Sequence, residues 1–167
     1  MIVSVGGTLP AFAELQLGIR LDLVEQLVYQ FTTGLAGYGP HSTTLLVSAG
    51  HLQGRPYHRY VLSRPTDVAE VAQAMNIFVT SDAISFFERY SNIAALNELY
   101  NATDTRWLPH HLNRSLRGIT LAKLAQQPNW PDLVAHYRTQ LWQRGTPAVL
   151  MDRYEQLATY LRHFSIN

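Results

Sequence analysis

The sequence predicts an α+β fold in a single domain, on two observations. Apolar and polar residues alternate early in the chain, which is the period of a half-buried strand, whereas later apolar residues recur at helical spacing. The strand pattern stops at Pro65 and does not return. We therefore expect an N-terminal antiparallel sheet of three to four strands with one inserted helix, followed by a helical C-terminal half. The domain would be strand-rich over residues 1–64 and helical over 65–167.

Four segments carry the strand pattern. Leucine and isoleucine alternate with polar residues over 15–21, and 2–5 is a shorter apolar run before a Gly-Gly turn. Residues 43–48 and 57–63 are rich in β-branched and aromatic side chains. The loop between them, 50–56, contains two glycines and a proline, which predicts that these two strands pair as a hairpin.

The inserted helix is predicted to begin at Asp22. Glu25 lies three residues later, so the pair resembles a capping box, and apolar residues follow at helical spacing as far as Phe31. Gly34 is a natural stop, because glycine adopts the left-handed conformation that ends many helices. The glycines at 34, 37 and 39 follow a helix and precede a strand, which is the wrong order for a phosphate-binding loop.

Later helices are predicted from their caps and apolar spacing. Thr66 begins the first, and the Thr-Ser-Asp run at 80–82 either kinks it or starts another. The remaining helices are expected over about 92–100, from Thr120, from Pro131 to about Gln143, and from Thr146-Pro147 to the end of the chain.

Charge and cysteine content exclude several classes of protein. The 167 residues include 13 basic and 12 acidic side chains, a net charge of +1, and only 15% of the residues are charged. This composition excludes a highly charged disordered chain, a polybasic nucleic-acid binder and an acidic tail. There is no cysteine, so disulfides and thiolate metal sites are excluded. The chain shows no signal-peptide pattern and no apolar run long enough to span a membrane, so we expect a cytoplasmic location.

The seven histidines carry no recognised motif. No two of them have the spacing of a helical metal site, so we predict neither a metal nor a cofactor. His51 and His58 flank the predicted hairpin loop and could approach each other. Asp132 and His136 lie four residues apart on a predicted helix and would share a face. They could be two metal ligands, a base and the residue that orients it, or a local hydrogen-bonded pair on the surface. These four residues are the candidates for a hydrolase-type site.

Residues 105–145 form the most distinctive segment. They contain six basic side chains and one acidic, a net charge of +5. Within this segment we predict a partner-binding surface made of Arg106, Trp107, His110, His111, Arg114 and Arg117. Arginine beside an aromatic ring suits an acidic protein surface or a nucleic acid. Three structural alternatives stay open: a solvated arginine face, cations at a helix C-terminus, and ion pairs with the more acidic first half.

The last predicted helix carries apolar residues at spacings of four and three. The stripe is Leu150, Tyr154, Leu157, Leu161 and Phe164. Such a stripe either packs on the core of its own domain or forms a homodimer or partner interface, and two heptads are too few for an independent coiled coil.

Taken together, these features favour a non-catalytic protein-binding module, such as an adaptor, an inhibitor or an immunity-type protein of bacterial type, with possible self-association. The first alternative is a small hydrolase-type enzyme with a histidine-based site. The second is a nucleic-acid binder that uses the arginine-rich segment at 105–145, which the small net charge disfavours.

Overall fold

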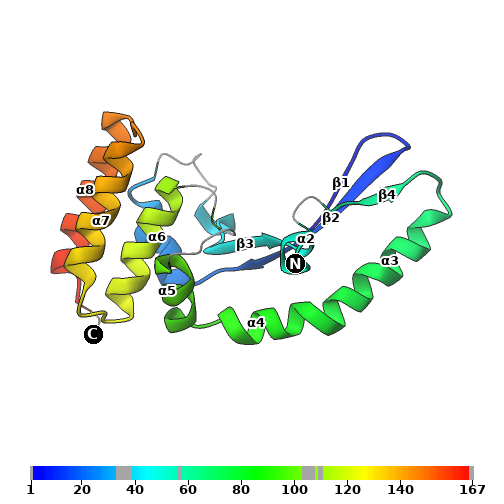
Figure 1. Ribbon diagram of the computed structural model, residues 1–167, viewed down its shortest axis with the longest axis horizontal. Helices are drawn as coiled ribbons and strands as arrows, with labels where there is room; N and C mark the ends of the chain where they lie inside the picture. The colour runs from blue at the N-terminus through cyan, green and yellow to red at the C-terminus, as the bar shows by residue number, and fades with distance from the viewer. Residues whose placement is uncertain (1, 33–38, 56–57, 103–107, 109–110, 166–167) are drawn as a thin grey trace. The chain divides into compact units, whose positions relative to one another are not determined.

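The computed structural model describes residues 2–32, 39–55, 58–102, 108 and 111–165 (Figure 1). They confirm the α+β class, with an antiparallel sheet in the N-terminal part and a helical C-terminal half. The chain divides into two compact units, which we call the sheet unit (residues 1–19 and 45–90) and the helical unit (residues 20–44 and 91–167). Within the described ranges, no helix has both the length and the apolar character needed to cross a membrane.

These compact units do not coincide with the strand-rich part (residues 1–64) and the helical part (65–167) of the sequence. The inserted helix belongs to the helical unit, and the first long helix after the strands belongs to the sheet unit. The inserted helix was assigned to the N-terminal half because it lies between strands in the sequence. Its packing partners lie about 90 residues away along the chain, where sequence order gives no guide.

The sheet is built around one long strand. The strands are β1 (Ile2–Gly6), β2 (Ala11–Ile19), β3 (Leu45–Ser48) and β4 (Tyr60–Leu62). All three short strands pair antiparallel with β2: β1 along one side, β3 and β4 along the other. On that second side, β3 pairs with residues 16–19 of β2 and β4 with residues 11–13, so the two follow one another along the same strand.

The predicted hairpin between the third and fourth strands is therefore wrong. A short helix, α2 (Ala49–Leu52), begins directly after β3. The Ser48 hydroxyl accepts a hydrogen bond from the His51 backbone N–H, which caps this helix. The glycine at position 50 packs so closely that a Cβ there would clash with the Arg55 carbonyl oxygen. The chain turns in the short helix α2, and β4 then pairs with β2 rather than with β3.

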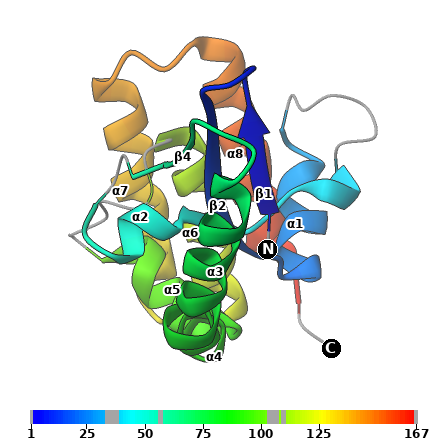
Figure 2. The ribbon, with the colours of Figure 1, turned by 90° about the vertical axis from the view of Figure 1, so that its right-hand side faces the viewer.

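One face of the sheet unit is covered by helix α3 (Asp67–Phe78). Burial alternates along β2, as the sequence pattern predicts. Ala11 and Ala13 of β2 pack with Leu62 of β4, and Val71 and Met75 of α3 pack against this cluster. Figure 2 shows α3 in front of the strands.

A π-helical turn joins α3 to α4. The turn is η2 (Val79–Ala83), and α4 (Ile84–Tyr90) continues the same helix. Up to Phe78, inward side chains recur at spacings of four and three, but the next buried positions are Ala83, Phe86 and Tyr90, one residue later than that spacing gives. A π turn contains one extra residue, which accounts for this shift. The Thr-Ser-Asp run lies within this π turn, and α4 begins directly after it.

The helical unit is built around α6. Its helices are α1 (Asp22–Tyr29), α5 (Ile93–Asn101), α6 (His111–Leu124), α7 (Trp130–Gln143) and α8 (Ala148–His163), with the 3₁₀ turn η1 (Gly39–His41) after α1. The central helix α6 packs against the other four. At Gly118, a Cβ would lie 2.9 Å from the Tyr137 hydroxyl, so only glycine permits this approach of α6 to α7.

One predicted helix start and one predicted cap are wrong, although α1 does begin at Asp22. Thr120 does not begin a helix, because its hydroxyl donates to the Leu116 carbonyl inside α6. Asp22 and Glu25 form no capping box: Asp22 accepts from the Arg20 guanidinium, and Glu25 turns inward to Arg117. The starts predicted from Pro131 and from Thr146-Pro147 are confirmed, within a residue or two.

Helices α6 and α7 end in the same backbone motif with different residues. At each end, a residue with positive φ is followed by an N–H that bonds back five residues, from Gln127 to Ala122 and from Thr146 to Leu141. The positive-φ residue is Gln126 (φ 54°) after α6 and Gly145 (φ 66°) after α7. Glycine adopts this conformation freely, but a residue with a Cβ is strained in it.

We predict that Gln126→Gly raises the free energy of unfolding by about 0.5–1 kcal/mol, because it removes this strain. Gly145→Ala is the matched opposite change. A Cβ at Gly145 would touch nothing within 4 Å, so its cost, about 1 kcal/mol, would come from the backbone alone. Urea unfolding followed by circular dichroism measures both. Loss of stability in Gln126→Gly would contradict the prediction.

Candidate functional site

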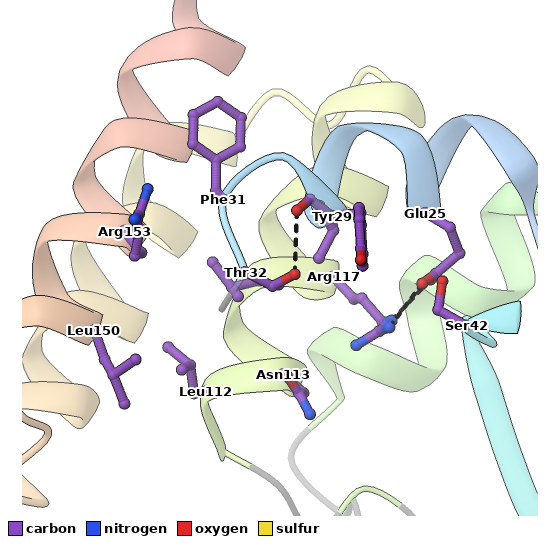
Figure 3. A pocket seen from close by; sticks show the side chains of 12 residues that line it. Glu25, Tyr29, Phe31, Thr32, Ser42, Leu112, Asn113, Arg117, Leu150 and Arg153 are labelled. Atoms are coloured by element: carbon purple, nitrogen blue, oxygen red, sulfur yellow. Dashed lines mark hydrogen bonds and ion pairs between the residues drawn. The ribbon is translucent and has the colours of Figure 1, made fainter. Parts of the chain in front are cut away.

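The candidate site is a pocket in the helical unit, between α1, α6 and α8 (Figure 3). Its volume is about 270 Å³. It is lined by Glu25, Val28, Tyr29, Phe31, Thr32, Ser42, Leu112, Asn113, Leu116, Arg117, Leu150 and Arg153. Residues from three helices and from the chain around η1 meet here, although they are far apart in the sequence.

A buried ion pair forms one side of the pocket. The Arg117 guanidinium donates two hydrogen bonds to the Glu25 carboxylate, from Nε at 2.8 Å and from Nη2 at 2.7 Å. Glu25 is 1% exposed, and the Arg117 side chain 13%. Two parallel hydrogen bonds of this kind set the orientation of both groups. The pair therefore joins α1 to α6 in one orientation, as the dashed line in Figure 3 marks.

The carboxylate of Glu25 is held in its charged form. Burial alone would raise its pKa, but the hydrogen bonds and positive charge of Arg117, with the hydroxyls of Ser42 and Thr44, outweigh burial and lower it. The Leu21 backbone N–H donates to the Thr44 hydroxyl oxygen, which leaves the hydroxyl proton for Glu25. Glu25, the only carboxylate among the described residues that line the pocket, is thus neutralised by the protein itself.

The rest of the described lining combines aliphatic side chains, a few polar groups and the guanidinium of Arg153. Leu112, Leu116 and Leu150 supply aliphatic surface. Arg153 comes from α8, one turn after Leu150, and makes no hydrogen bond or ion pair with any residue that the structure describes. The pocket therefore combines aliphatic walls with one guanidinium that has no counter-charge among those residues.

A row of aromatic side chains continues from the pocket along α8. The Phe31 ring lies 5.6 Å from that of Tyr160, and the Tyr160 ring lies 6.0 Å from that of Phe164. Tyr160 is 42% exposed. These spacings are typical of interacting aromatic pairs. We call the pocket and this row together the pocket surface.

The predicted arginine surface is only partly described. Arg106, Trp107 and His110 lie outside the described residues. His111 begins α6 and hydrogen-bonds to Arg144. Arg114 donates to the carbonyls of Tyr100 and Ala102 at the C-terminus of α5.

Arg114 and Arg117 thus match two of the structural alternatives, a cation at a helix C-terminus and an ion pair with the first half of the sequence. Their part in partner binding stays a prediction. The segment nevertheless reaches the candidate site, because Leu112 and Asn113 follow His111 in the first turn of α6 and line the pocket.

The apolar stripe of α8 lies mostly inside the helical unit. Tyr154, Leu157 and Leu161 are fully buried, and the Tyr154 hydroxyl donates to the Val134 carbonyl of α7. The two ends of the stripe differ from its middle, because Leu150 lines the pocket and Phe164 ends the aromatic row. The middle of the stripe therefore packs on its own core, whereas its ends belong to the pocket surface.

The histidine candidates have local partners. His51 Nδ1 lies 2.9 Å from the Ser48 hydroxyl, and the His58 ring contacts that of Tyr60. His136 is hydrogen-bonded to Gln140, one turn further along α7 from Asp132.

His51 and His58 belong to the sheet unit, whereas Asp132 and His136 belong to the helical unit. Of the four, His58 lines a shallow hollow of the sheet unit, together with Asp67 and Glu70. Among the residues described, no three histidine or acidic side chains cluster closely enough to hold a metal ion.

Sequence reasoning missed the two charged groups that characterise the pocket. Glu25 lies next to Val24 and three residues before Val28, on the apolar face of its helix, and an acidic residue on such a face is a signal of a buried partner. That partner is 92 residues away. Arg153 gave no signal, because it resembles any polar residue on a surface helix.

Comparison of the chain with protein-family models, curated proteins and solved structures found no match.

We predict that Glu25→Gln lowers the free energy of unfolding by about 3 kcal/mol at pH 7, because it leaves the Arg117 guanidinium buried without its counter-charge. Glu155→Gln is the matched control. Glu155 pairs with Arg138 through the same two-bond geometry, but both side chains are partly exposed, at 39% and 44%. We expect Glu155→Gln to lower the free energy of unfolding by less than about 1 kcal/mol.

The pH dependence provides a second measurement. The pKa of Glu25 is lower in the folded state than in the unfolded state, where it is about 4.3. The contribution of the charged Glu25 to the free energy of unfolding is therefore complete above the unfolded-state pKa, and it is lost as the pH falls through the folded-state pKa. The stability gap between wild type and Glu25→Gln should be constant from pH 7 to about pH 5.5 and narrow below that. A gap that widened on acidification would contradict the assigned charge state.

Proposed function

We propose that the helical unit is a non-catalytic protein-binding module and that the pocket surface is where the partner binds. The observation that carries this proposal is the pocket itself, whose aliphatic walls adjoin the guanidinium of Arg153, which has no counter-charge among the described residues. An apolar recess with one polar anchor is a common receiving site for a protruding side chain.

The size and composition of the surface favour a protein partner. A volume of about 270 Å³ is at or below the lower end of the range for drug-sized ligands, but it accommodates one or two side chains. Arginine and aromatic residues dominate the binding energy of protein interfaces. Arg153, Tyr160 and Phe31 supply both types beside the pocket.

The arginine-rich segment has a positioning part in this proposal. Its first helical turn supplies Leu112 and Asn113, and Arg117 holds α1 against α6 through Glu25. We therefore expect substitution of Arg117 to weaken partner binding by disturbing the pocket, and substitution of Arg153 to weaken it directly.

The test is affinity capture from a nuclease-treated extract of the cells that make the protein. The wild-type chain is compared with Arg153→Glu, with Tyr160→Ser, and with Arg162→Glu as control. Arg162 lies exposed on the same helix and receives the same charge change, away from the pocket.

We expect a protein that is retained by wild type and Arg162→Glu and lost from the other two variants, with the dissociation constant raised at least tenfold by calorimetry. The proposal fails if no captured protein depends on Arg153 or Tyr160. It also fails if capture disappears with the nuclease treatment, which would indicate a nucleic acid instead.

A further inference from the structure

We infer that the segment entering the pocket is acidic: it carries a carboxylate side chain directly beside a bulky apolar side chain. This inference rests on the proposed function and names the chemistry of the partner. It follows from the charge at the pocket and from the distance between its cationic and aliphatic parts.

Charge selects a carboxylate. The pocket is lined by two guanidinium groups and one carboxylate, so it keeps one net positive charge. Arg117 and Glu25 satisfy each other, which leaves Arg153 as the group that attracts an anion. A guanidinium binds carboxylates through paired hydrogen bonds, so an acidic side chain is its natural partner.

The aliphatic walls of the pocket favour an apolar side chain on the partner residue next to the one that carries the carboxylate. Leu150 and Arg153 are three residues apart on α8, so they share a face with their Cβ atoms about 5–6 Å apart. Leu112 and Leu116 of α6 line the same recess. A segment that places a carboxylate at Arg153 therefore presents its next side chain to leucine surface, where an apolar group is favoured because its burial removes it from water.

Among the described residues that line the pocket, no acidic side chain competes for Arg153. Its carboxylate, on Glu25, is 1% exposed and engaged by Arg117. On α8 itself, Asp152 accepts from Gln156 and Glu155 accepts from Arg138, so the described acids nearest in sequence have partners of their own. An incoming carboxylate thus meets a cation that the described residues have not neutralised.

The test uses three acetylated and amidated hexapeptides. The first has the sequence serine–alanine–aspartate–leucine–alanine–serine, the second replaces the aspartate by asparagine, and the third replaces the leucine by serine. Each is titrated into the full ¹⁵N-labelled chain, and dissociation constants come from amide chemical-shift changes. The protein variants are Arg153→Gln and the control Arg162→Gln.

We expect the acidic peptide to bind with a dissociation constant of about 1 mM and to shift amides of α6 and α8 at the pocket. The asparagine and serine peptides should each bind about tenfold more weakly. Arg153→Gln should remove the preference for aspartate over asparagine, and Arg162→Gln should preserve it.

Three outcomes overturn the inference: equal binding of the aspartate and asparagine peptides, shifts confined to residues away from the pocket, or no saturable shift at 10 mM (roughly tenfold above the expected constant). The peptide titration needs no knowledge of the native partner. If capture depends on Arg153 and Tyr160 but the acidic peptide fails, the binding module stands and the partner chemistry is wrong. If capture shows no such dependence, the proposed function itself fails.

Discussion

The helical unit depends on the ion pair between Glu25 and Arg117. Each group is costly to bury alone, so neither α1 nor α6 can leave the other without exposing an unpaired charge to an apolar environment. Aliphatic contacts would allow the two helices to slide, whereas two hydrogen bonds between planar groups allow essentially one arrangement. The pair thus adds specificity of position to the packing of α6 against its neighbours.

The same pair shapes the chemistry of the pocket. Because the Glu25 carboxylate is neutralised by Arg117, it does not pair with Arg153. The pocket therefore presents the Arg153 guanidinium from α8 and leucine side chains from α6 and α8. A structural interaction and the proposed recognition site therefore share one cavity but use different residues. Changes at Glu25 alter the position of the walls, and changes at Arg153 alter what the walls attract.

Much of the fold could be predicted from the sequence because its signals are local. The alternation in β2 and the proline-marked starts of α7 and α8 depend on neighbouring residues, and they appear in the structure. The predictions were wrong where the local structure is determined by residues far away in the sequence. Glu25 resembles half of a capping box until Arg117 is placed beside it, and β3 and β4 resemble a hairpin until β2 is seen to pair with both. The α8 stripe was identified, but its division between core and pocket surface depends on α1 and α6.

The π-helical turn within the sheet unit shows how local and tertiary preferences compete. The same residues, all kept in one unbroken α-helix, would have better local hydrogen bonding. That helix would rotate everything after the turn by about 100°, so Phe86 and Tyr90 would leave their buried positions and Ser85 and Arg89 would replace them. The π turn therefore keeps the buried face of α4 in line with that of α3 by taking up one extra residue. A deletion of one residue between Phe78 and Ala83 would convert the turn to α-helix and leave Phe86 and Tyr90 buried, so the chain length here can change by one residue without moving the core.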